Sequence, residues 1–420
     1  MKLEHAPCPV VSLTETIGGG FFGYFDKSPW PPDGSDRLLL HRAPFEHRMP
    51  LAGEPIEIGL LEQGHYRALG TSTAWNFQQG AMLQWLPGAA DTIIYNDMEG
   101  ADSIALRLDT RTGDTATLAR PIAALSPTGR DALSLNFGRI NALKPEYGYA
   151  GALDNTEHSA CPDRDGLWRI DMQTGGGELL LSTSAVARYA PETTMSDAIH
   201  YLNHPLYSPD GRRFCFLHRW IDPAGTQRTR LLVAGRDGSE LRVLISGMAS
   251  HMGWRNGHEL LAWAGERRLL APAQRSLLRR LPVGRMLGSL YRRLGKPASL
   301  KAAMLGDGYI LFDTRDGHRT SVGTGALSMD GHCSFRGDGD WFITDTYPDR
   351  HGKAALIVAS FAQDRAYRVH EFQFPTGLDG EIRCDLHPRW HPTQPLICVD
   401  YMADGKRHMG QVDVAAIMAA

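Results

Sequence analysis

The sequence predicts an all-β fold, a seven-bladed β-propeller formed by residues 1–420 as a single domain, and two observations lead to it. A tight turn followed by a short strand recurs seven times along the chain. Four of these turns follow a histidine, two further residues and an aromatic residue. Four copies in one register indicate equivalent positions in a repeated unit. Seven such units can close into a ring without a long free sheet edge, whereas a pair of β-sandwiches accounts less well for the common register.

Each of the seven units opens on Gly, Pro, Asp or Asn, which supply a tight turn, and continues into an apolar or alternating run typical of a strand. The units begin near residues 31, 86, 126, 208, 255, 336 and 391. Most are followed by a second pair of alternating runs around a polar turn, as in 309–323. One unit is therefore four short antiparallel strands, which is the composition of a propeller blade.

Two intervals between units are longer than the others, so two blades are expected to carry insertions. One covers 141–163, a loop rich in Tyr, Gly and Asn. The other covers 266–303, where leucines at helical spacing predict two helices with a break at 282–284. This helical insertion holds ten Lys or Arg and one Glu, hence a charge of +9. It is expected either to make peripheral contact with a membrane or a protein, or to cover the propeller with its arginines in water.

The bulk composition indicates a cytoplasmic protein with no affinity for nucleic acid. The net charge of −3 gives no general attraction to a polyanion. The six cysteines are scattered without a Cys-x-x-Cys pair, which suits a reducing compartment. The first residues lack the apolar core of a signal peptide, and no apolar run is long enough for a transmembrane helix.

The repeated histidine predicts a ring of side chains around the propeller axis. The strand before each turn is expected to line the central channel, so equivalent positions in successive blades face one another. These positions, three residues before each aromatic or its equivalent, are Lys27, Met82, Ile122, His204, His251, His332 and His387. Converging imidazoles are typical ligands of Zn, Mn or Fe and typical general bases near neutral pH. The alternative is that each imidazole donates to a backbone carbonyl and only fixes the channel.

A carboxylate accompanies the last histidine of this ring. Asp385 and His387 lie two apart, so on a strand both side chains project from one face. Together with His332 of the neighbouring blade they form a set of two histidines and one carboxylate. Such a set suits a hard or borderline divalent ion, Mn or Zn, that also holds a substrate oxygen.

Further polar residues at strand ends are candidates for binding an acidic oligosaccharide. Amides meet sugar hydroxyls, aromatic rings meet sugar faces, and arginines bind carboxylates through two parallel hydrogen bonds. The predicted substrate-binding residues are Lys27, Gln78, Gln79, His204, His218, Arg219, Arg383 and Arg389.

The histidine signatures resemble those of a known family. They are His204 before Tyr207, His251 before Trp254, His332 before Phe335 and His387 before Trp390. Over about 200–413 this series, with a strand opened by arginine, is similar to oligogalacturonate lyases and to the wider group of TolB-like seven-bladed propellers. In the first half of the chain the likeness rests on the blade rhythm.

The resemblance implies a manganese-type ion at the propeller mouth and a function for several residues. His251 corresponds to the base and Arg230 to the arginine that binds the uronate. His332 and His387 correspond to metal ligands of the family.

The final signature departs from the family at two positions. Asp385 stands where the family has a second histidine, and Ile382 where it has a glutamine. The predicted function is a metal-dependent lyase that cleaves a uronic-acid-containing glycan by β-elimination. The alternatives are a glycoside hydrolase at the same site and a non-catalytic glycan-binding propeller that serves polysaccharide assembly or acts as a scaffold for a partner or membrane.

Overall fold

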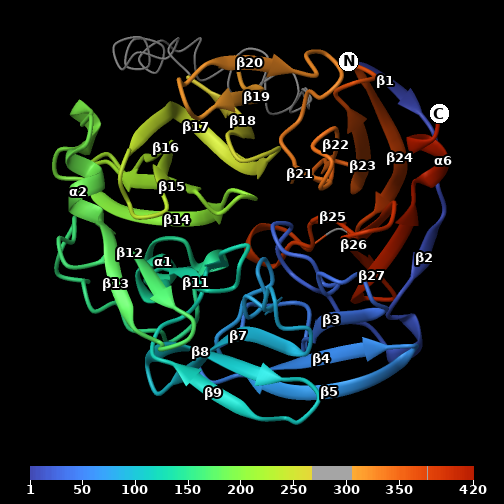
Figure 1. Ribbon diagram of the computed structural model, residues 1–420, viewed down its shortest axis with the longest axis horizontal. Helices are drawn as coiled ribbons and strands as arrows, with labels where there is room; N and C mark the ends of the chain where they lie inside the picture. The colour runs from blue at the N-terminus through green and yellow to red at the C-terminus, as the bar shows by residue number, and fades with distance from the viewer. Residues whose placement is uncertain (267–304, 376) are drawn as a thin grey trace.

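A computed structural model describes residues 1–266, 305–375 and 377–420. Small antiparallel sheets surround a central axis, as a β-propeller requires, and the predicted fold class is confirmed (Figure 1). The predicted helical insertion at 266–303, and the contact proposed for it, lie outside the described residues apart from Glu266. Among the helices of the described part, none is long and apolar enough to cross a membrane.

The described strands form six sheets. The largest divides into two groups that share the long strand β17, because the first half of β17 pairs with β16 and its second half with β18. Seven strand groups therefore follow one another within the described ranges.

The strands of the first three groups are β3 (Arg37–Arg42), β4 (Ile56–Glu62) and β5 (His65–Ser72); β6 (Gln84–Trp85), β7 (Thr92–Glu99), β8 (Asp102–Asp109) and β9 (Thr115–Leu118); and β10 (Ala124–Leu125), β11 (Asp131–Ser134), β12 (Gly166–Asp171) and β13 (Gly177–Ser182). The large sheet contains β14 (Ile199–Tyr207), β15 (Arg213–Ile221), β16 (Gln227–Gly235), β17 (Arg242–Trp254), β18 (Glu259–Gly265), β19 (Gly308–Asp313) and β20 (Arg319–Val322). The last two groups contain β21 (Ser334–Phe335), β22 (Trp341–Asp345), β23 (Lys353–Ser360), β24 (Arg365–Gln373) and β1 (Lys2–His5); and β25 (Arg389–Trp390), β26 (Leu396–Ala403), β27 (Lys406–Asp413) and β2 (Val10–Ser12).

Short helices occupy some of the connections. They are α1 (Phe137–Leu143), α2 (Thr183–Arg188) and α6 (Ala415–Met418), with the 3-10 turns η1 (Glu15–Ile17), η2 (Pro145–Tyr147), η3 (Thr193–Met195) and η4 (Gly380–Ile382). The segment 141–163, expected to be a loop, contains the end of α1 and all of η2. Asn136 caps α1 by accepting from the backbone N–H of Arg139, which explains why this helix forms without a strong apolar period.

The N-terminal residues close the ring. β2 pairs antiparallel with β27, and β1 pairs parallel with β24, so the first residues of the chain add outer strands to the last two groups. Figure 1 shows both termini at this place. Backbone hydrogen bonds between the two ends of the chain thus hold the ring shut and cover the edges of β24 and β27.

After β2 the chain runs inward, and residues 21–26 lie in the centre of the propeller. Phe21 forms an isolated bridge with His41, and this bridge takes the place of an innermost strand in the first group. The rings of Tyr24 and Phe25 pack within one core cluster that also contains Met82. The predicted ring position Lys27 follows this segment, whose course the sequence pattern did not indicate.

His41 of β3 holds this inner segment. Its Nδ1 lies 2.9 Å from the carbonyl of Phe22, and its Nε2 accepts the backbone N–H of Ala81 at 3.0 Å. Both contacts are satisfied by the neutral ring with its proton on Nδ1. A Cβ at Gly80 would lie 2.2 Å from Cε1 of the His41 ring, and Gly80 has a φ of 56°, so only glycine fits beside this histidine.

The burial of His41 predicts an acid-sensitive fold. Burial lowers the pKa of His41 from 6.5 to about 4, so the unfolded state binds the proton more tightly than the folded state. The stability from the neutral ring is fully present above about pH 6.5 and is lost as the pH falls towards 4. Between pH 7 and pH 5 this group alone is expected to cost about 2 kcal/mol. Urea unfolding of wild type and His41→Gln at both pH values measures it: the variant should be less stable at pH 7 but lose less on acidification. Equal losses in the two proteins would contradict the assignment.

Candidate metal centre

Three of the four signature histidines meet in the centre of the propeller. The ring centroids of His251 and His332 are 4.1 Å apart, and those of His332 and His387 are 4.3 Å apart. His204 lies beyond Tyr24, which stacks on it at 5.1 Å. The predicted convergence of the four positions is therefore observed, with one aromatic ring inserted between His204 and the others.

Local irregularities in the inner strands turn these histidines towards the axis. The pairing of β14 with β15 shifts its register between Asn203 and Leu206, and that of β17 with β18 shifts between Ala249 and Met252. His204 and His387 have φ values of 50° and 42°, and the equivalent Met82 has 55°. Such left-handed residues and bulges cost backbone energy of about 1–3 kcal/mol each and concentrate at functional sites.

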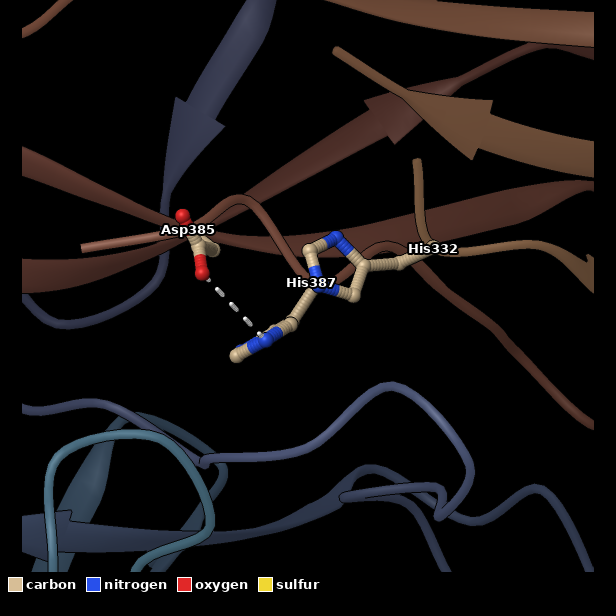
Figure 2. A group of neighbouring side chains, drawn as sticks. All are labelled: His332, Asp385 and His387. Carbon is tan, nitrogen blue, oxygen red and sulfur yellow. Dashed lines mark ion pairs between the residues drawn. The ribbon is translucent and has the colours of Figure 1, made fainter. Parts of the chain in front are cut away.

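The predicted set of His332, Asp385 and His387 forms one compact group. One ligand atom from each of the three residues lies within 4.8 Å of the other two, and all three side chains are buried. Figure 2 shows the side chains turned towards one another, with His387 Nε2 at 4.0 Å from Asp385 Oδ2. His332 comes from the connection before β21, and the other two from the connection between η4 and β25.

A carboxylate behind the group orients the imidazole of His332. His332 Nδ1 lies 2.9 Å from both oxygens of Asp345, the last residue of β22. Burial raises the pKa of Asp345 to about 7, and above that pH the ionised carboxylate accepts the Nδ1 proton. His332 Nε2 then keeps its lone pair. A carboxylate behind a histidine is the usual support of a metal-binding imidazole.

The residues present fit a divalent ion. Burial lowers the pKa of His332 and of His387 well below the ordinary value, which keeps both rings neutral, the form that binds metals. His387 Nε2 is buried and has no hydrogen-bond partner in the described structure. A buried nitrogen without a partner costs about 1–3 kcal/mol unless a ligand satisfies it. Two imidazole nitrogens and a carboxylate oxygen are ligands that both manganese and zinc accept.

His251 has a different set of partners. Its Nδ1 lies 2.9 Å from Asp330 Oδ1, and its Nε2 lies 3.2 Å from Tyr347 Oη. Because a carboxylate only accepts, the neutral ring carries its proton on Nδ1, and Nε2 accepts from the tyrosine hydroxyl. Ser250 Oγ donates to the same carboxylate at 2.7 Å. The tautomer of His251 is thereby fixed, with a basic Nε2, and its ring lies beside His332, Asp385 and His387, which are together called the metal group below.

Asp330 was not among the residues predicted from the sequence. Its signal was present, because Asp330 precedes His332 by two residues, just as Asp385 precedes His387. The same spacing has different outcomes: Asp385 turns towards its own histidine, whereas Asp330 binds the histidine of the neighbouring group. Tyr24 and Phe25 were also missed, although the glycine-rich run before them indicated an irregular segment.

Two predicted site residues, Arg230 and His218, are held elsewhere by structural hydrogen bonds. All three donor nitrogens of Arg230 are occupied, by His218 Nδ1 at 2.9 Å and by the carbonyls of Ala190 and Val186 at 2.9 and 2.7 Å. The other ring nitrogen of His218 bonds His200 at 2.9 Å. The packing of α2 and the segment after it over β16 thus gives Arg230 and His218 structural partners.

Arg389 supports the site through its hydrogen bonds to the inner segment, residues 21–26. It is 1% exposed and forms an ion pair with Asp400 at 2.6 Å. It also donates to the carbonyls of Gly23 and Tyr24 and to Cys398 Sγ. Its position is therefore that of an anchor for the inner segment.

Arg383 and Gln78 lie against the metal group. Arg383 Nε donates to Asp385 at 2.7 Å, and its guanidinium lies over the ring of Tyr347 at 5.1 Å. Gln78 donates to the backbone carbonyl of Arg383 at 3.0 Å. Gln79 is buried beside it, where its backbone N–H bonds Asn76.

The last three predicted residues lie beside two cavities. His204 and Arg219 line a cavity of about 30 Å³ together with Tyr24, Tyr147 and His251. Arg219 forms no ion pair with an acidic side chain within the described residues. Lys27 pairs with Asp26 at 2.9 Å and lines a separate cavity of about 240 Å³.

Solved structures of other proteins share the fold of this chain. The sequence matches no described protein family and no curated protein. Among solved structures, an oligogalacturonate lyase in complex with manganese has a TM-score of 0.61 at 15% identity, with all of both chains covered. The oligogalacturonate lyase of Vibrio parahaemolyticus has a TM-score of 0.59 at 14% identity, with 97% of this chain and 99% of that chain covered.

TolB of Acinetobacter baumannii also matches, over 91% of this chain and 64% of that chain at 12% identity, but its TM-score of 0.39 is too low to support an argument. The resemblance to oligogalacturonate lyases is thus confirmed for the fold.

Proposed function

We propose that this chain is a metal-dependent lyase that cleaves a uronic-acid-containing oligosaccharide by β-elimination. The observation that carries the proposal is the contact between His251 and the group of His332, Asp385 and His387. The ring of the candidate base lies 4.1 Å from a candidate metal ligand. The full-length similarity in fold to two oligogalacturonate lyases supports the same class of reaction.

The chemistry needs a base and a positive environment close together. The proton at C5 of a uronate is weakly acidic, and its removal leaves enolate-like charge on the adjacent carboxylate. A divalent ion at His332, Asp385 and His387 supplies a Lewis acid for that charge when bound. His251 Nε2, whose tautomer is fixed by Asp330, takes the proton.

Positive side chains around the group suit an acidic substrate. Arg383 lies beside Asp385 and Tyr347, and Arg219 lines the cavity next to His204 and His251. These two arginines take the uronate-binding function that the family resemblance implied for Arg230. The cavity of about 30 Å³ holds about one water molecule, so side chains that line it, such as Tyr147, have to move before a sugar can enter.

The test is turnover of uronate oligosaccharides by protein loaded with Mn²⁺ or Zn²⁺. We expect the ultraviolet absorbance of an unsaturated uronate to rise, and His251→Gln to lower kcat by about 10²–10⁴-fold, the usual contribution of a general base. His65→Gln, on the exposed edge of β5, is the matched control and should leave kcat unchanged. Protein that binds one equivalent of metal and a uronate glycan without turning it over would instead establish a binding propeller. Absence of both metal binding and turnover would refute the proposal.

A further inference from the structure

Tyr347 is the hydrogen-bond partner of His251, the candidate base, and the reaction described above gives it no role. It follows β22 and lies between His251 and Arg383. Asp330, His251 and Tyr347 form a chain of two hydrogen bonds, 2.9 Å and 3.2 Å long. In this series of hydrogen bonds the Asp330 carboxylate fixes the His251 imidazole, and the imidazole accepts from the Tyr347 hydroxyl.

β-Elimination needs an acid as well as a base. The electron pair of the C5–H bond forms the double bond between C4 and C5, and the C4–O4 bond breaks with its pair on O4. Expulsion of an alkoxide is unfavourable unless a donor protonates O4 as it leaves. An acid placed beside the base can serve only a leaving group on the same side of the sugar ring.

We propose that Tyr347 is this acid and that the reaction is a syn-elimination; this inference rests on the proposed lyase function. His251 Nε2 takes the C5 proton while Tyr347 Oη gives its proton to O4. The imidazolium then returns a proton to the phenolate across their hydrogen bond. One proton has moved from C5 to O4, and both side chains regain their starting states.

The separation of the two groups selects the stereochemistry. Acid and base on opposite faces of a pyranose ring, each at hydrogen-bond reach of its atom, are about 6 Å or more apart. The observed 3.2 Å between His251 Nε2 and Tyr347 Oη suits H5 and O4 on one face. Uronates of the gluco and manno configurations have H5 and O4 cis, whereas galacturonate has them trans. The substrate class is therefore a glucuronate- or mannuronate-containing oligosaccharide linked through O4.

Substrate choice tests the stereochemistry. Metal-loaded protein is given oligomannuronate, glucuronate-containing oligosaccharides and oligogalacturonate of equal chain length. We expect kcat/KM for a gluco- or manno-configured substrate to exceed that for oligogalacturonate by at least about 100-fold. Preference for oligogalacturonate would overturn the inference and leave the proposed lyase function intact. Absence of turnover with every uronide would overturn both.

Tyr347→Phe tests the acid with two further readouts. The variant should eliminate the natural leaving group at least about 100-fold more slowly, yet still exchange the C5 hydrogen for deuterium from solvent. It should also expel fluoride from a 4-deoxy-4-fluoro uronide at close to the wild-type rate, because fluoride leaves without protonation.

His251→Gln, in contrast, should lose elimination, exchange and fluoride release together. Tyr66→Phe, which removes a hydroxyl bonded to Glu57 on the first strand group, is the control and should match wild type in all three. Wild-type elimination by Tyr347→Phe, or equal losses of all three activities in that variant, would overturn the assignment. The comparison of two leaving groups within one variant does not depend on how much of it folds.

Discussion

Replacement of His387 by asparagine is expected to weaken the binding of Mn²⁺ and Zn²⁺ by at least about 100-fold and to leave the metal-free protein as stable as before. The first effect follows from the loss of a ligand nitrogen in a group of three. The second follows from two features of the wild type: His387 Nε2 is buried without a partner, and the residue has a φ of 42°. Asparagine is one of the few residues with a side chain that adopt this left-handed conformation readily.

Thermal unfolding with and without metal separates the two effects. Wild type at a metal concentration of about 100 times Kd gains about 2.7 kcal/mol, and the variant should gain almost nothing. His391→Asn is the matched control. His391 lies just after β25, where its Nδ1 accepts the backbone N–H groups of Thr393 and Gln394. His391→Asn should therefore lower stability and keep the metal response. A metal-free His387→Asn protein destabilised by more than about 2 kcal/mol would mean that this histidine is structural.

Replacement of Arg389 by methionine is expected to lower the free energy of unfolding by about 3–5 kcal/mol. The side chain is 1% exposed and pairs with Asp400, which also accepts the backbone N–H groups of Phe22 and Gly23 at 3.2 Å. Removing one partner of a buried pair leaves the other charge desolvated and unpaired. The inner segment that contacts the histidines is released at the same time.

Urea unfolding measures this loss, and Arg389→Met combined with Asp400→Leu should recover part of it, because the unpaired charge is then removed. The control is Lys353→Met. Lys353 pairs with Glu371 on the solvent-exposed surface of the sixth strand group and should contribute at most about 1 kcal/mol. A loss below about 1 kcal/mol for Arg389→Met would show that the pair does not anchor the segment.

The propeller and the metal group could be predicted because both depend on local periodicity. The turn signals repeat at each strand group. The expectation that Asp385 and His387 share one face of a strand is wrong, because both lie in the connection before β25 and His387 is left-handed, yet the two-residue spacing still keeps them close together. The histidine signature then places His332 and His251 on the same ring. These inferences use neighbours in the chain or equivalent positions in a repeat.

The sequence did not predict the surroundings of residues that are packed against segments without a helical or strand periodicity. The neighbours of Arg230 and His218 are set by α2 and the segment after it, whose carbonyls occupy two donor groups of the arginine. Tyr24 and Phe25 reach the histidines through a run of glycines that carries no strand or helix signal. Asp330 orients His251, which comes from another strand group. The spacing of residues along the sequence does not show that these two side chains are neighbours in space.

The central position of Tyr24 and Phe25 has a consequence for the biogenesis of the protein. These residues leave the ribosome early, but His332 and His387, which they contact, are made more than 300 residues later. At about 5–20 residues per second the aromatic segment waits roughly 20–70 s for its partners. During synthesis an apolar stretch of the nascent chain is thus exposed without its final contacts, and chaperone capture of truncated chains that end before residue 387 is its natural signature.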